Sequence, residues 1–179
     1  MVSLSFLFWC FILLFAIIGM NRGWARELLL AFSLVIGICM VTLMQEFLPA
    51  VDDLVTDLLH GGNVILRSAL LALAAFLGYR TPNLPRVSTS PRLIRGSFAD
   101  RLVGLTLGAL NGFLLFGSLW FYMHHADYPF QSILSPDSGS AAGDAALRLL
   151  TILPPVWLGA PLVYFVSAVG LIGLIVVFL

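Results

Sequence analysis

Glycine recurs at every fourth position, at Gly104, Gly108 and Gly112, inside an apolar run that extends from residue 102 to 123. Positions four apart lie on the same face of a helix, so the run predicts a helix with a stripe of glycines. Such a stripe lets the backbone of a second helix approach closely, as membrane helix pairs do. We therefore expect a membrane helix that packs against another helix along these glycines.

The composition of the chain also favours a membrane. Hydrophobic residues make up 60% of the 179 positions and charged residues only 10%, whereas a soluble domain carries about 25% charged residues. The mean hydropathy is +1.04 and the mass is 19.5 kDa, too small a globule to bury so many apolar side chains. The net charge is zero without a basic tail, so no nucleic-acid partner is expected.

Five apolar runs approach or reach the length needed to cross a bilayer, and they predict an all-α, polytopic membrane helix bundle with about five transmembrane helices. The runs are 4–20, 28–44, 64–79, 102–123 and 161–179. We divide the chain into a four-helix membrane core at 1–124, a polar outer loop with a short amphipathic helix at 125–158, and a fifth transmembrane helix at 159–179.

The connections between the runs differ in charge. Segment 45–63 is acidic, and its apolar residues follow the spacing of an amphipathic helix, so we expect it to lie flat at the interface. Arg67 enters the third run and is expected to snorkel to the interface, with an ion pair to one of those acids as the alternative. The Arg-rich segment 80–101 is expected to bind anionic lipid headgroups, and an acidic partner is the alternative.

These charges also predict an orientation. With the N-terminus outside and five crossings, the inner connections contain seven arginines and the outer connections two. Positive residues favour the cytoplasmic side, so the C-terminus is expected in the cytoplasm if all five runs span.

The apolar runs contain few polar residues that could bind a ligand or take part in a reaction. Asn111 is expected to hydrogen bond to another helix, and lining the path of a transported species is the alternative. His124 and His125 are adjacent and point about 100° apart on a helix, which makes them a poor chelate, even with Asp127 nearby. We therefore predict a protein that is not an enzyme, with no catalytic residues, metal site or cofactor.

Two short blocks resemble the colicin V production protein family, the CvpA-like membrane proteins. The first is GMNRGWAREL, which follows the first run and contains Arg22, Gly23, Arg26 and Glu27. The second begins at Asp100 and Arg101 and continues through the three glycines. The chain departs from that family in its fifth run and in Asn111, where members often carry Arg.

The resemblance implies a non-enzymatic protein of the bacterial inner membrane, linked to toxin production or secretion and to envelope homeostasis. The alternative is a subunit of a small transporter or channel oligomer. Expected partners are the lipid bilayer, anionic headgroups, a second copy of the chain, or a membrane protein of secretion or the envelope. The charge topology places both blocks at one face, so we predict a charged cluster that joins the first hinge to the fourth span, with Glu27 and Arg101 as opposite partners.

Overall fold

The computed structural model describes residues 4–80, 98–130, 136 and 139–178, and regular secondary structure within them is helical. The basic residues Arg86, Arg92 and Arg95 lie outside the described residues, so the predicted headgroup-binding segment is described only at its two ends. The helices are α1 (Leu4–Arg22), α2 (Trp24–Phe47), α3 (Pro49–Leu58), α4 (Gly62–Arg80), α6 (Phe98–His125), α7 (Ala141–Leu150), α8 (Pro154–Trp157) and α9 (Leu162–Phe178).

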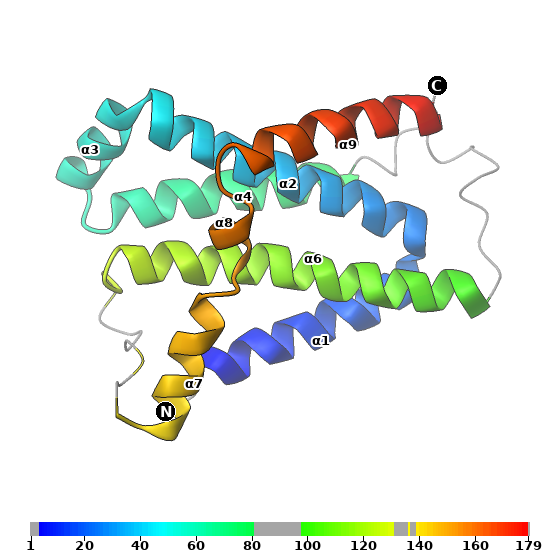
Figure 1. Cartoon of the computed structure of the whole chain (residues 1–179), viewed down its shortest axis with the longest axis horizontal. Coiled ribbons are helices and arrows are strands. Elements are labelled where there is room, and N and C mark those ends of the chain that lie inside the picture. Colours follow the sequence, from blue (N-terminus) through cyan, green and yellow to red (C-terminus); the bar gives the residue numbers. More distant parts are fainter. Residues whose placement is uncertain (1–3, 81–97, 131–135, 137–138, 179) are drawn as a thin grey trace.

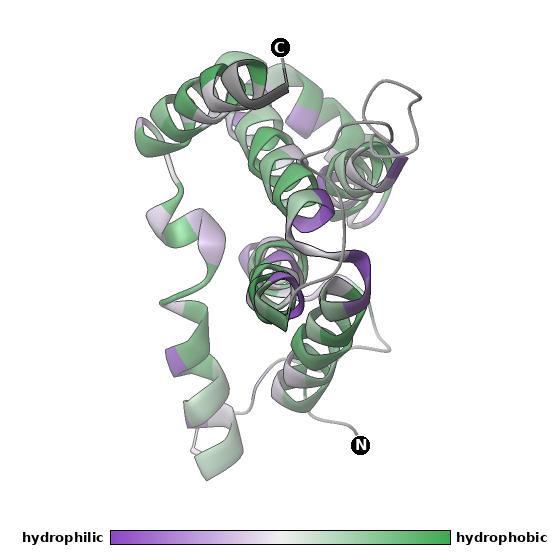
Figure 2. Cartoon of the chain, turned by 90° about the vertical axis from the view of Figure 1, so that its right-hand side faces the viewer, coloured by the Kyte–Doolittle hydropathy of each residue, from purple (hydrophilic) through white to green (hydrophobic). Residues whose placement is uncertain are grey.

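Five of these helices, α1, α2, α4, α6 and α9, lie side by side and alternate in direction (Figure 1). We call the end that contains the α1–α2 junction, Arg80 and Phe98 the hinge end. The opposite end, with α3 and His125, is called the α3 end. Helices α7 and α8 run across the bundle, as the view along it shows (Figure 2). The alternating helices give the up-and-down arrangement that short connections favour.

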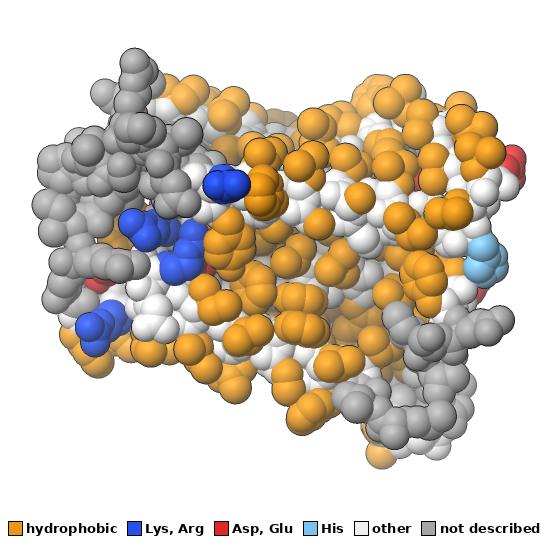
Figure 3. Space-filling model, turned by 180° about the vertical axis from the view of Figure 1, so that it is seen from behind, with side chains coloured by type: hydrophobic (Ala, Val, Ile, Leu, Met, Phe, Trp, Pro, Cys, Tyr) orange, Lys and Arg blue, Asp and Glu red, His pale blue; other side chains and the backbone are white. Residues whose placement is uncertain are grey.

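The bundle has the dimensions and the surface of a membrane protein. Helices α1, α2, α4 and α6 are each long and apolar enough to cross a bilayer. The pair formed by the α7–α8 segment and α9 is bent by 57° and counts as a fifth span only if it is one broken helix. Apolar side chains cover the middle of the surface between the two ends (Figure 3). These findings confirm the predicted all-α bundle with four or five helices that could span a membrane.

The glycine stripe of α6 faces α1. A Cβ added at Gly108 would overlap the carbonyl oxygen of Phe15, and one added at Gly104 would overlap that of Gly19. A Cβ at Gly112 would lie 3.0 Å from the Phe15 Cβ. The two backbones therefore touch along about two turns, and a larger residue there would force the helices apart.

The main hydrophobic core lies between α2, α4 and α6. Its fully buried side chains include Leu34 and Ile38 of α2 and Leu71 of α4. A second cluster joins α1, α6 and α7 around Phe8 and Trp120, whose ring centroids are 5.5 Å apart. Helix α2 is thus the central element, while α7 is attached at the margin.

The two shorter helices α3 and α7 can be compared with the amphipathic helices that the sequence predicts. Helix α3 confirms the amphipathic helix predicted in segment 45–63, and none of its side chains is buried. The sequence pattern is helical over 145–153, but α7 begins four residues earlier at Ala141, because the Ser140 Oγ accepts a hydrogen bond from the Gly143 amide at 3.0 Å. The small residues around Ser140 are typical of a loop, so the cap was not apparent from the pattern.

The substitution Gly108→Ala is expected to lower the free energy of unfolding by about 2 kcal/mol, because its Cβ meets the backbone of α1. Gly173→Ala is the matched control: nothing lies within 4 Å of the added Cβ. Alanine is the better helix former, so the control should be neutral or stabilising. Denaturation in detergent, followed by circular dichroism, measures both; equal stabilities would contradict the described α1–α6 contact.

Candidate functional site

A buried carboxylate lies near the hinge end. Glu27, in the first turn of α2, has no solvent-exposed surface. Its Oε1 accepts a hydrogen bond from Arg22 Nη1 at 2.7 Å, and its Oε2 accepts one from Asn111 Nδ2 at 2.8 Å. Asn111 Nδ2 also lies 2.9 Å from the backbone oxygen of Glu27. The charge is therefore paired and hydrogen bonded, as burial in an apolar medium requires.

A fourth helix joins this group through an aromatic ring. The guanidinium carbon of Arg22 lies 4.1 Å from the ring centroid of Tyr79 in α4. A cation over an aromatic face is attracted by the ring quadrupole. We call Arg22, Glu27, Tyr79 and Asn111 the Glu27 cluster. Its four side chains come from α1, α2, α4 and α6, so one ionic group connects four helices.

Asp100 provides a second link at the hinge end. Its Oδ1 accepts a hydrogen bond from the backbone amide of Trp24 at 3.0 Å, although 76 residues separate them. The carboxylate thus caps the N-terminus of α2, where the helix dipole favours a negative charge. Gly23 makes this approach possible: its φ is +86°, and an added Cβ would lie 3.1 Å from Asp100 Oδ1.

The predicted cluster of charged residues is only partly assembled in this way. Arg22, Gly23, Glu27 and Asp100 lie together, whereas Arg26 is half-buried and Arg101 is exposed; within the described residues neither of these two makes an ion pair. The expected pairing of Glu27 with Arg101 is therefore wrong. Glu27 pairs with Arg22 because the turn at Gly23 brings the end of α1 next to the first turn of α2.

A second ionic group lies at the α3 end. Arg67, 8% exposed, forms an ion pair through Nη2 with Asp52 Oδ2 of α3. When the side-chain amide of Gln45 is oriented to satisfy its hydrogen bonds, its Oε1 lies 3.1 Å from Arg67 Nη1. The guanidinium carbon lies 5.8 Å from the ring centroid of Tyr122. We call Gln45, Asp52, Arg67 and Tyr122 the Arg67 cluster.

The outcome for Arg67 corrects one expectation. Its side chain does not snorkel to the interface but turns inward to an acid of the preceding segment, which was the alternative reading. The chain reverses between α3 and α4 at Gly61, whose φ is +71°, and this reversal brings Asp52 back over Arg67. The acidic segment thus supplies the counter-ion that makes burial of the guanidinium tolerable.

The histidines also lie at the α3 end. His60 Nε2 is 3.0 Å from the Pro129 carbonyl oxygen, and the rings of His124 and His125 have centroids 6.0 Å apart. Burial raises the pKa of Tyr128, an effect that the hydrogen bond from Trp120 Nε1 partly offsets. In the part of the chain that the structure describes, no three His, Cys, Asp or Glu residues are close enough to hold a metal ion.

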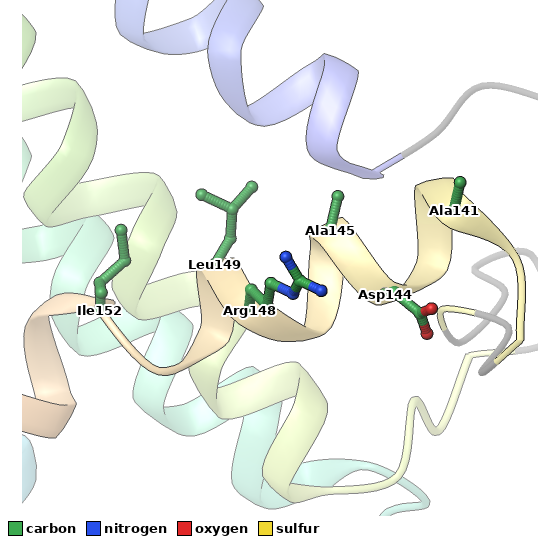
Figure 4. A pocket seen from close by; sticks show the side chains of 6 residues that line it. All are labelled: Ala141, Asp144, Ala145, Arg148, Leu149 and Ile152. Atoms are coloured by element: carbon green, nitrogen blue, oxygen red, sulfur yellow. The ribbon is translucent and has the colours of Figure 1, made fainter.

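An open groove of about 660 Å³ lies on α7 (Figure 4). Its lining comes from one face of α7 and from Ile152 just after that helix, with Asp144 and Arg148 one turn apart. Catalysis needs a nucleophile, a base and a stabilising group that converge on one point. The groove provides no such convergence. Its remaining lining residues are Ala141, Ala145 and Leu149.

Comparisons of the chain with protein-family models, curated proteins and solved structures find no match. Functional inference therefore depends on the geometry of the two clusters and on the resemblance of the two sequence blocks. Sequence reasoning did not identify Tyr79, Tyr122 or Gln45 as members of the two clusters, or Ser118 as a buried hydroxyl. Aromatic and hydroxyl residues in apolar runs are common, and no spacing signal distinguishes those that meet a guanidinium.

The substitution Glu27→Ala is expected to lower the free energy of unfolding by about 3 to 5 kcal/mol, because Arg22 and Asn111 lose their shared partner. Asp53→Ala removes an exposed carboxylate and is the control. Unfolding in detergent measures both. A Glu27→Ala variant as stable as the control would show that the Glu27 cluster does not hold the bundle together.

The substitution Asp52→Asn is expected to loosen α3, because that helix buries no side chain and is tied to α4 by the ion pair with Arg67. Hydrogen–deuterium exchange should rise across residues 49–58 and stay unchanged in α6. Asp53→Asn, one position along, serves as the matched control. Equal exchange in the two variants would mean that other contacts dock α3.

Proposed function

We propose that this chain is a non-enzymatic integral membrane protein of the CvpA type, which supports toxin production or secretion and envelope homeostasis in the bacterial inner membrane. One observation carries the proposal: residues from both blocks that resemble the family meet at the hinge end. Arg22, Gly23 and Glu27 come from the first block and Asp100 from the second. The glycines of the second block pack against α1, whose last residues begin the first block.

The distribution of charge supports an orientation with the hinge end in the cytoplasm. Basic side chains gather at one end of the surface (Figure 3). At the hinge end, α1 and α4 end with Arg22 and Arg80, and Arg26 and Arg101 lie in the first turns of α2 and α6. The α3 end instead carries an acidic set consisting of Glu46, Asp52, Asp53, Asp57 and Asp127. Positive residues are retained on the cytoplasmic side, and exposed arginines there attract anionic headgroups.

The proposed role is that of a helical scaffold with a fixed arrangement of spans. Close α1–α6 contact and the two ionic clusters define how the helices cross, because a buried charge tolerates few alternative positions. The outer faces of α1 and α9 carry large exposed apolar residues, such as Phe6, Trp9 and Phe165. In a bilayer these faces contact lipid, a second copy, or a membrane protein of secretion or the envelope.

In a bacterium that encodes this chain, deletion of the gene is expected to reduce the secretion of a colicin V-type toxin and to raise sensitivity to detergents. A wild-type copy should restore both phenotypes, whereas Glu27→Ala should not, because the bundle is expected to lose its fixed arrangement. Asp53→Ala is the matched control and should complement fully. Normal secretion and detergent resistance after deletion would contradict the proposal.

A further inference from the structure

One face of α6 carries three buried polar side chains. Asn111, Ser118 and Tyr122 are 0%, 0% and 2% exposed. They are spaced by seven and then four residues, so all three lie on the same helical face. Asn111 belongs to the Glu27 cluster and Tyr122 to the Arg67 cluster. The α6 polar stripe, as we call these three residues, therefore extends through the core from one ionic cluster to the other.

Several polar atoms along this line have no protein partner. Asn111 Oδ1 and Ser118 Oγ are buried and make no hydrogen bond to any described residue. The same is true of Asp52 Oδ1 and Arg67 Nε within the Arg67 cluster. Buried polar groups in native proteins are satisfied by protein or by internal water. These atoms point to sites for water between the two clusters.

We propose that the α6 polar stripe is a water-mediated path for protons between the Glu27 cluster and the Arg67 cluster. The three side chains of the stripe are at most 2% exposed, so they do not line an open channel for hydrated ions. A proton instead moves along single hydrogen-bonded waters and hydroxyl groups. Asn111, at one end of the stripe, contacts the Glu27 carboxylate, and Tyr122, at the other end, faces Arg67, the ion-pair partner of Asp52. Each of these carboxylates can accept and release a proton. This inference goes beyond the scaffold role proposed above.

The transfer is balanced and needs no oxidant or reductant. A hydronium ion on one side loses one O–H bond as its proton forms an O–H bond with the Glu27 carboxylate, which lies between Arg22 and Asn111. Each later hop breaks one O–H bond and forms another along the waters. The last hop protonates Asp52, which faces Arg67, and Asp52 then releases the proton to the other side. The proton gradient supplies the driving force.

Leu114 is the barrier in this path. It is 3% exposed and lies on the same face of α6, between Asn111 and Ser118. Those two residues are about 10 Å apart along the helix at 1.5 Å per residue. Hydrogen-bonded oxygens are separated by about 2.8 Å, so two or three waters must enter beside Leu114 to connect them. The path therefore conducts slowly, and a polar residue at position 114 should open it.

The test uses the full chain in vesicles of phosphatidylethanolamine and phosphatidylglycerol that contain a pH-sensitive dye. A potassium gradient with valinomycin drives protons inward, and the rate of acidification is measured. The parent should exceed protein-free vesicles. Ser118→Ala should lower the rate about fivefold, because the path loses one hydrogen-bonding group next to the barrier. Leu114→Asn, whose side chain has the same branching and number of heavy atoms, should raise the rate by about the same factor, because it adds a polar group to the barrier.

Ser33→Ala is the matched control. It removes a hydroxyl from α2 that donates to the Ala74 carbonyl at 2.6 Å and lies off the stripe, so it should conduct like the parent. Helical content and size-exclusion profiles show that each variant is folded. A shift in either Ser118→Ala or Leu114→Asn in the expected direction supports the path. A parent no leakier than protein-free vesicles, or two variants that conduct like the parent, overturns it and leaves the scaffold role unaffected.

Discussion

The buried carboxylate of Glu27 is the constraint on which the bundle depends. An ionised group without solvent contact is strongly unfavourable unless it is paired and hydrogen bonded. Arg22 and Asn111 meet this need from α1 and α6, and Tyr79 of α4 covers the guanidinium. The relative positions of these helices cannot change without exposing the charge to an apolar medium. Hydrophobic packing alone would leave them free to slide, because lipid is as apolar as the core.

Glycine and charge act together at the hinge end. The backbone contact along Gly104 and Gly108 brings α1 close to α6, and this closeness places Arg22 and Gly23 at the level of the first turns of α6. Gly23 then turns the chain so that Asp100 can cap α2. The two sequence blocks are thus parts of one junction. At the other end, Arg67 and Asp52 make a similar junction between α4 and α3.

The sequence predicted the helices well because apolar length and amphipathic spacing are local signals. It indicated that Asn111 would bond to another helix, but not that Glu27 would be its partner, since 84 residues separate them. The choice of Arg101 as the counter-ion of Glu27 failed for a related reason. Which side of α6 faces the hinge depends on how closely α1 packs against the glycines of α6. That packing involves residues far apart in the sequence, so no local pattern predicts it. No spacing or motif in the sequence indicated that Tyr79 and Tyr122 would face arginine side chains.

The cap on α2 has a consequence for biogenesis. During synthesis α1 and α2 reach the membrane before α6 has been made. The Trp24 amide therefore has no Asp100 to bind, and Glu27 Oε2 has no Asn111, until more than 70 further residues have been added. During that interval Arg22 is the partner within the hairpin that can neutralise the carboxylate. The first hairpin is therefore inserted as an ion-paired but incomplete unit, and its final depth and tilt are set only when α6 arrives.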